Sequence, residues 1–202
     1  MQDAERTINL YVERMHGRGG KTPQALYPVP GYTAWSSGIT TVGTRGMKKA
    51  NGRLFAVVGN TLWELANNGA ATSRGTVAQD GNPAQLVYSG VVANQLGICA
   101  GGAVYAFDLG TNTLSATSLT SGYTHLGYAH GYGLAFNPTT GRIQLSNLNN
   151  LATYGGVTFI QRSRFPDPWQ AMFVDQNSLI WAVGSESLEV WYDTGQGTQP
   201  FA

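Results

Sequence analysis

The sequence predicts an all-β protein, and more specifically a β-propeller with an extended N-terminal arm. Three observations lead to this fold class: the composition, a hairpin pattern that recurs along the chain, and the lack of a convincing helical stripe. Only 11% of the 202 residues are charged, whereas 27 are glycine and 11% are aromatic. This composition is typical of chains with many strands and tight turns, and it disfavours a helical bundle. The nearest helical pattern, residues 4–15, is weakened by β-branched Thr7, Ile8 and Val12.

The first part of the chain differs in kind from the rest. We expect residues 1–31 to form an extended arm and residues 32–202 to form the propeller blades. Residues 16–31 contain three prolines and four glycines, which predict an extended, polyproline-like segment without a hydrogen-bonded ladder. A Pro-Val-Pro-Gly run ends this segment. Residues 32–35 then follow as the first predicted strand.

A β-hairpin pattern recurs four times after the arm. Each copy has an apolar strand, a turn that contains glycine, and a second strand in which side chains alternate. The starts of the copies are separated by about 42, 38 and 45 residues, which is the period of propeller blades and favours a propeller over a sandwich. The predicted hairpins span Leu54–Leu65, Leu96–Asp108, Leu134–Asn147 and Leu179–Asp193.

More polar strand candidates lie between the hairpins, at residues 84–93 and 156–165. We therefore expect four-stranded blades, each with the hairpin on the inside and two outer strands. A single blade cannot bury both of its faces, so neighbouring blades must stack around an axis. The fourth hairpin lacks its outer strands. Either the arm supplies them and closes a four-blade ring, or this chain is the front part of a larger propeller that other chain completes.

Charge and cysteine content give no sign of a nucleic-acid-binding protein or of a chain with an internal disulfide. The net charge is +1, but residues 1–53 carry eight basic and three acidic groups, whereas residues 54–202 carry four basic and eight acidic groups. The basic end could face an acidic partner or could be a solvated arm. The single cysteine, Cys99, lies in an apolar run and is expected to be buried. The first ten residues do not resemble a signal peptide, and no apolar run is long enough to cross a membrane.

No arrangement of residues predicts catalysis, a metal site or a cofactor. His125 and His130 are five apart, which is not the spacing of a helical metal site. Glu186 and Glu189 would lie on opposite faces of a strand, so they do not form an acid pair. Trp169 lies between Asp167 and Asp175 and could form a shelf for a carbohydrate, but a core aromatic beside a proline turn is the simpler interpretation. We therefore expect no enzyme activity and no cofactor.

Several motifs resemble the packaged-DNA stabilisation proteins of short-tailed bacteriophages, also called tail hub or nozzle proteins. The likeness begins with an Asn-Leu-Tyr-x-Glu segment and continues to a Pro-x-Pro-Gly run. Later motifs include an Ala-His-Gly-Tyr-Gly strand and a Gly-Ser turn before an acidic, aromatic strand. The matching segments are Arg6–Glu13, Gly20–Gly31, Ala129–Gly133, Phe165–Asp167 and Gly184–Trp191. Members of this family are usually more than twice as long as this chain, which favours the larger propeller.

The resemblance implies a structural role in the virion rather than a reaction. Such proteins assemble, usually as a hexamer of identical subunits, below the portal and adaptor rings of the phage. They close the tail channel over packaged DNA and present surfaces to the tail needle or fibres, so DNA is met only in the channel. The resemblance also implies synthesis in the host cytoplasm and no insertion into a membrane by this chain. The alternative is a carbohydrate-binding propeller for receptor recognition, with exposed Trp or Tyr at equivalent positions of its blades.

If the chain is a structural virion protein, we expect the arm from Asn9 to Gly31 to pack against another subunit or another part of the virion. The alternative role for the same residues is only to seat the arm on its own propeller. The residues expected to contact a partner are Asn9, Tyr11, Glu13, Lys21, Pro28, Pro30 and Gly31.

Overall fold

The structure, a computed structural model, describes seven stretches of the chain: residues 10–14, 24–31, 33–36, 38–39, 43–161, 167–196 and 200–202. The chain divides into two compact units, residues 1–35 and 36–202. The described part of the first unit contains an antiparallel hairpin of β1 (Leu10–Arg14) and β2 (Gln24–Pro28).

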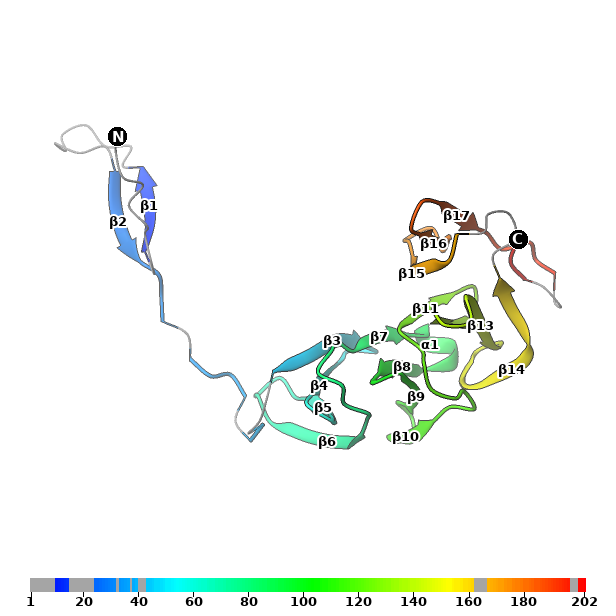
Figure 1. The fold of residues 1–202 in the computed structure, drawn as a ribbon. Helices are drawn as coiled ribbons and strands as arrows, with labels where there is room; N and C mark the ends of the chain where they lie inside the picture. The colour runs from blue at the N-terminus through cyan, green and yellow to red at the C-terminus, as the bar shows by residue number, and fades with distance from the viewer. Residues whose placement is uncertain are drawn as a thin grey trace. The chain divides into compact units, whose positions relative to one another are not determined.

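The described part of the second unit consists of four antiparallel sheets (Figure 1). The sheets follow one another along the chain, and we call them blades 1 to 4. Blade 1 contains β3 (Thr44–Ala50), β4 (Arg53–Val58), β5 (Thr61–Leu65) and β6 (Ala71–Thr76). Blade 2 contains β7 (Gln85–Tyr88), β8 (Gln95–Ala100), β9 (Ala103–Asp108) and β10 (Thr113–Ala116), with the one-turn helix α1 (Gly90–Ala93) after β7. Blade 3 contains β11 (His125–Ala129), β12 (Tyr132–Asn137), β13 (Arg142–Asn147) and β14 (Asn150–Gln161), and blade 4 contains β15 (Trp169–Val174), β16 (Ile180–Gly184) and β17 (Leu188–Trp191).

The four predicted hairpins are confirmed as the pairs β4–β5, β8–β9, β12–β13 and β16–β17. Their place within the blade differs from the expectation. In blades 1 to 3 one strand flanks the hairpin on each side, so the hairpin is the middle pair and not the inner pair. The first strands β3, β7, β11 and β15 are neighbours of one another, which is the arrangement of innermost strands in a propeller.

Two-residue turns close several of these strand pairs. Asn51-Gly52 joins β3 to β4, Gly101-Gly102 joins β8 to β9, and His130-Gly131 joins β11 to β12. Both residues of each turn have a positive φ, from +45° to +89°. This conformation matches the right-handed twist of an antiparallel pair, and glycine and asparagine adopt it most easily. The abundance of glycine in the sequence therefore serves the turns between strands.

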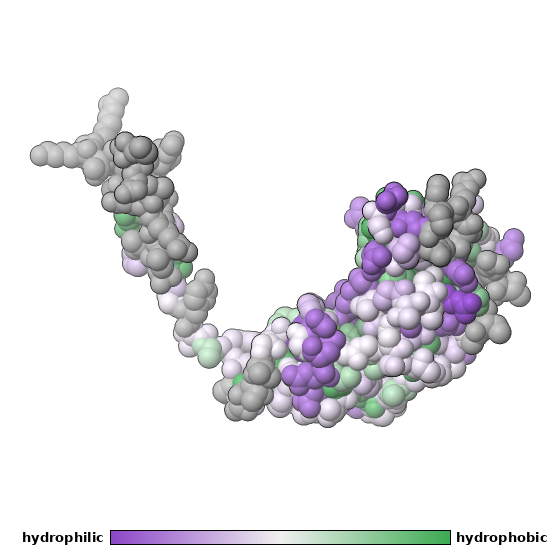
Figure 2. All heavy atoms as spheres, in the orientation of Figure 1, coloured by the Kyte–Doolittle hydropathy of each residue, from purple (hydrophilic) through white to green (hydrophobic). Residues whose placement is uncertain are grey.

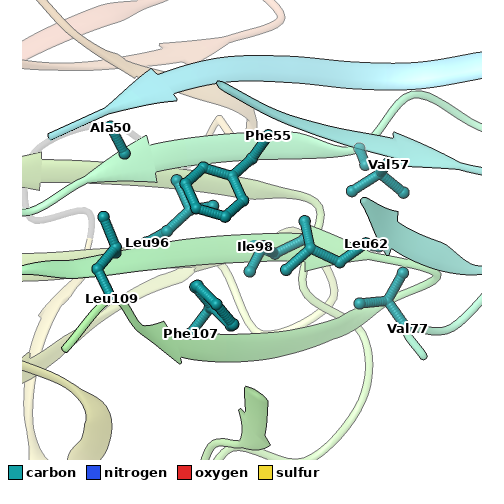
Figure 3. Packing of buried hydrophobic residues seen from close by; sticks show 11 residues of the cluster. Ala50, Phe55, Val57, Leu62, Val77, Leu96, Ile98, Phe107 and Leu109 are labelled. Atoms are coloured by element: carbon teal, nitrogen blue, oxygen red, sulfur yellow. The ribbon is translucent and has the colours of Figure 1, made fainter. Parts of the chain in front are cut away.

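The core lies between the blades. Phe55, Val57 and Leu62 of blade 1 pack against Leu96 and Phe107 of blade 2, and all five are fully buried. Figure 3 shows these side chains pointing toward one another from the two sheets. A smaller cluster around Cys99 and Val104 joins blade 2 to Leu126 and Ala135 of blade 3. A third cluster joins blade 3 to Trp169, Met172, Ile180 and Ala182 of blade 4 and includes Phe201. Burial between stacked sheets is thus what holds the second unit together.

Three expectations about single segments are wrong. Residues 24–28 form β2 and pair with β1, so this part of the proline-rich segment does have a hydrogen-bonded ladder. Residues 33–35 are not a strand, and blade 1 begins at Thr44. The predicted strand 84–93 is interrupted after Tyr88 by α1, because the chain must reverse direction before β8. The hydroxyl of Ser89 both donates to the carbonyl of Gln95 and accepts from its N–H, which closes that reversal.

The other outer-strand candidate, residues 156–165, lies in β14 as far as Gln161, and residues 162–166 are outside the described residues. On the face of the second unit that Figure 2 shows, pale, weakly polar colours predominate and hydrophilic residues gather in separate patches. This surface agrees with the low charge of the sequence.

Candidate interaction surfaces

The hairpin β1–β2 presents aromatic and aliphatic side chains to solvent. Tyr11 pairs in register with Tyr27, and their rings stack with centroids 5.8 Å apart and an interplanar angle of 26°. Tyr11, Tyr27 and Leu26 are all exposed, Leu26 to 56%. An isolated two-stranded hairpin is at best marginally stable in water. Exposed apolar side chains on such a hairpin are typical of a segment that gains stability by docking.

The structure brings some of the predicted contact residues together. Tyr11 and Glu13 lie on β1, and Pro28 ends β2 opposite Leu10, so these three residues belong to one hairpin.

Other predicted contact residues lie outside that ladder. Pro30 and Gly31 follow it as exposed residues without regular structure. Asn9 and Lys21 are outside the described residues.

A pocket of about 540 Å³ opens on the face where the β6–β7 loop and the β8–β9 turn meet the β10–β11 loop and the β12–β13 turn. Its described lining includes Asp80, Cys99, Gly101, Tyr123 and Thr139, but neither lysine nor arginine. With Asp80 and no basic side chain in its described lining, the pocket is not suited to a phosphate.

Arg45 holds Asp80 and Asn82, which line one wall of this pocket. Its side chain is only 5% exposed. The guanidinium donates to the carbonyls of Asn82 (2.7 Å), Gly59 (3.0 Å) and Ala78 (2.8 Å), and to Oδ1 of Asp80 (2.7 Å). The arginine thus ties the β4–β5 turn to the β6–β7 loop. A lone arginine at the start of a strand has no sequence pattern that would predict this role.

The pKa of Asp80 lies below its usual value, mainly because the Asn82 side chain donates a hydrogen bond to it, with a smaller contribution from the charge of Arg45. The carboxylate is therefore ionised at neutral pH. It serves the loop as a fixed acceptor and not as a general acid.

Asp167 and Asp175, the two acids considered for a carbohydrate shelf, each hold a turn of blade 4. Asp167 accepts hydrogen bonds from the backbone N–H groups of Ser185, Glu186 and Ser187 at 2.8 to 3.0 Å. These hydrogen bonds hold the pKa of Asp167 well below its usual range, and the bond from the backbone of Glu186 contributes most. Asp175 accepts from the backbone of Asn177 and Leu179 and from Nε1 of Trp181.

Trp169 is 1% exposed and packs in the core, which confirms its interpretation as a core aromatic. No carbohydrate shelf is therefore built around it.

The remaining candidates for chemistry have structural roles. Cys99 is buried as expected, and burial raises the pKa of its thiol to about 12, so it is a poor nucleophile. His130 lies in a turn with Nδ1 3.3 Å from Oδ2 of Asp193. In the part of the chain that the structure describes, no three His, Cys, Asp or Glu residues are placed to hold a metal ion. The same part has no helix long and apolar enough to span a membrane.

Partly exposed aromatics do occur on the same strand of different blades. Trp63, Tyr105 and Trp191 lie on the third strands of blades 1, 2 and 4. Each of the three packs against a cluster of buried residues, so they belong to the packing of the blades.

The stacked antiparallel sheets with adjacent first strands define the chain as a β-propeller protein. A family model described as "Phage_stabilise: Bacteriophage P22 Gp10, beta-propeller" matches residues 9–202. The chain belongs to this family, and it is therefore a structural protein of a bacteriophage virion, from a family that stabilises packaged DNA. A comparison with curated proteins gave no match.

Solved structures share the fold at low sequence identity. The computationally designed Ika4 protein superposes with a TM-score of 0.54 at 12% identity, over 81% of this chain and 99% of that chain. A streptogramin B lyase gives 0.53 at 14% identity, over 90% of this chain. The designed Ika8 protein gives 0.52 at 11% identity, over 93% of this chain. The chain spans 61% of the lyase and 57% of Ika8, and these likenesses concern the fold alone.

Proposed function

We propose that this chain is a tail hub, or nozzle, protein of a short-tailed phage. In this role it helps to close the tail channel and to retain packaged DNA beneath the portal–adaptor complex. Its partners are other copies of itself in a hexameric ring, the portal and adaptor proteins, and the tail needle or fibres. DNA is contacted only in the channel, and the chain is not an enzyme.

The observation that carries the proposal is membership of a packaged-DNA stabilisation family over residues 9–202. Two structural features support it. The acids considered for a carbohydrate shelf hold turns, as the hydrogen bonds of Asp167 and Asp175 illustrate. The hairpin β1–β2 forms a separate unit with exposed Tyr11, Leu26 and Tyr27, which suits docking on another subunit or on the adaptor.

The proposal is tested by assembly of tails on purified portal–adaptor complexes. Deletion of residues 1–31 is expected to abolish incorporation while the second unit keeps its β-sheet circular dichroism. Tyr11→Ala is expected to reduce incorporation several-fold, because the stacked Tyr11–Tyr27 pair is exposed for contact. Val92→Ala, at an exposed position of α1, is the matched control. Normal incorporation of the deletion variant would contradict the proposed role of the arm, and failure of the unaltered chain to bind would contradict the hub function.

A further inference from the structure

Blade 1 contains two asparagines that are each followed by glycine. Asn51-Gly52 forms the turn between β3 and β4, and Asn68-Gly69 lies in the turn between β5 and β6. An asparagine before glycine is the one most prone to lose its side-chain amide, because glycine has no side chain to hinder its own backbone nitrogen. The two pairs share this local chemistry, so a difference in their reactivity would come from the fold.

The loss of the amide requires a free backbone nitrogen and an accessible side-chain carbon. The nitrogen of the glycine attacks Cγ of the asparagine, so a bond forms between these atoms and the bond from Cγ to Nδ2 breaks. The glycine nitrogen gives up its proton and the departing nitrogen takes up one, so ammonia leaves and a five-membered succinimide ring remains. Water then opens the ring at either of its two carbonyl carbons, which gives aspartate or isoaspartate.

The fold restrains the pair Asn68-Gly69 in three ways. The N–H of Gly69 donates to the carbonyl of Ala66 at 2.9 Å, so the attacking nitrogen is engaged. Oδ1 of Asn68 accepts from the N–H of Ala70 at 3.1 Å, so the side-chain amide is held within its own turn. Gly69 is also buried, which shields its N–H from the base that must remove the proton.

The pair Asn51-Gly52 lacks these restraints. Both residues are exposed, and a Cβ atom added to Gly52 would meet nothing within 4 Å. Within the part of the chain that the structure describes, the N–H of Gly52 donates no hydrogen bond. This is a consequence of the two-residue turn, in which the ladder ends at the flanking pair Ala50 and Arg53.

The side chain of Asn51 joins two blades. Its Nδ2 donates to Oδ1 of Asn94 at 3.1 Å. Asn94 lies between α1 and β8 of blade 2 with a φ of +50°, and its carbonyl accepts from the N–H of Leu109. The hydrogen bond holds the nitrogen that would leave, and it leaves Cγ and Oδ1 of Asn51 without a partner among the described residues.

We propose that Asn51 is a site of spontaneous deamidation, and that the reaction releases the β3–β4 turn from blade 2. Either product has a carboxylate in place of the amide, so the donor to Asn94 is lost and a negative charge faces its Oδ1. Isoaspartate also adds one carbon to the backbone of a turn in which both residues have a positive φ. This inference does not depend on the proposed function.

Peptide mapping by mass spectrometry tests the site. The full chain is incubated at mildly alkaline pH and digested in acid, and the deamidated fractions at Asn51 and Asn68 are followed over time. In the folded chain Asn51 should react about tenfold faster or more, because two hydrogen bonds must break before Asn68 can react. In urea that unfolds the chain, the two rates should become similar. An equal or faster reaction at Asn68 in the folded chain would overturn the proposal, as would a ratio that persists in urea.

Variants that carry the product residue test the consequence. Asn51→Asp lacks the donor to Asn94. Asn68→Asp is the matched control, because its carboxylate can still accept from the N–H of Ala70. Relative to this control, Asn51→Asp should raise the equilibrium constant for unfolding in urea by about threefold to tenfold. Equal constants for the two variants would overturn the proposed release of the turn.

Discussion

Blades 3 and 4 each contain a central hairpin, but they differ in the exposure of one sheet face. This is the face turned toward the next blade in the chain, which we call the forward face. The forward face of blade 3 places Ile143 and Leu145 in the core, at 0% and 1% exposure. The forward face of blade 4 leaves Leu188 and Val190 exposed. The residue types are alike, so the difference lies in whether a neighbouring blade is present and not in the strand itself. Apolar alternation in a propeller strand thus predicts a face made for burial without telling whether this chain alone covers it.

The largest loss of stability is expected from a substitution on the covered forward face of blade 3. Leu145→Ala should lower the free energy of unfolding by about 2–5 kcal/mol, because Leu145 is fully buried between blades 3 and 4 and the substitution leaves a cavity. Urea unfolding followed by tryptophan fluorescence measures the change. A loss below about 1 kcal/mol would mean that the two blades are not packed as described.

An intermediate effect is expected at the polar rim between blades 1 and 2. Glu64 accepts hydrogen bonds from Arg53 and Arg74, and Arg53 also donates to the carbonyl of Leu109 in the next blade. Glu64→Gln should therefore cost about 1–2 kcal/mol at neutral pH. Equilibrium unfolding in urea measures it, with Glu186→Gln, an exposed glutamate in the β16–β17 turn, as the control.

The same variant should change the acid sensitivity of the chain. The pKa of Glu64 is lowered from 4.5, mainly by the Arg53 hydrogen bond. A lowered pKa contributes stability that is present above the unfolded value and is lost as the pH falls through the folded value. The unaltered protein should therefore lose more stability than Glu64→Gln on acidification below about pH 5. Parallel acid-unfolding curves would contradict this role of Glu64.

The smallest loss of stability is expected from a substitution on the exposed forward face of blade 4. Leu188→Ala should change the free energy of unfolding by no more than about 0.5 kcal/mol, because the side chain already meets water. Urea unfolding measures the change. A loss as large as that of Leu145→Ala would contradict the exposure of this face.

The sequence predicted the hairpins well because each depends on local signals. Alternation of apolar residues fixed the faces, and turns such as Gly101-Gly102 fixed the reversals. The first strand of each blade was harder to predict, since β3 carries Arg45, Lys48 and Lys49 and its place depends on the neighbouring blade.

The candidate surfaces were predicted less completely. The pairing of Tyr11 with Tyr27 was not predicted because Pro23 precedes β2 and Pro28 ends it, and proline normally opposes a hydrogen-bonded ladder. Neither Arg45 nor the turn-holding role of Asp167 was predicted, because their hydrogen bonds join residues 14 to 37 apart in the chain and no local sequence pattern indicates such pairs.

The buried thiol of Cys99 gives this chain a built-in chemical reporter. Its sulfur lies 3.4 Å from the carbonyl of Tyr123, in a cluster that joins blades 2 and 3, and burial raises the pKa of the thiol to about 12. Cys99 also lines the pocket of about 540 Å³, so an alkylating reagent can approach it from the pocket as well as after the interface opens. The rate of labelling at this one atom therefore measures how well the closed structure around the pocket protects the thiol, without any engineered probe.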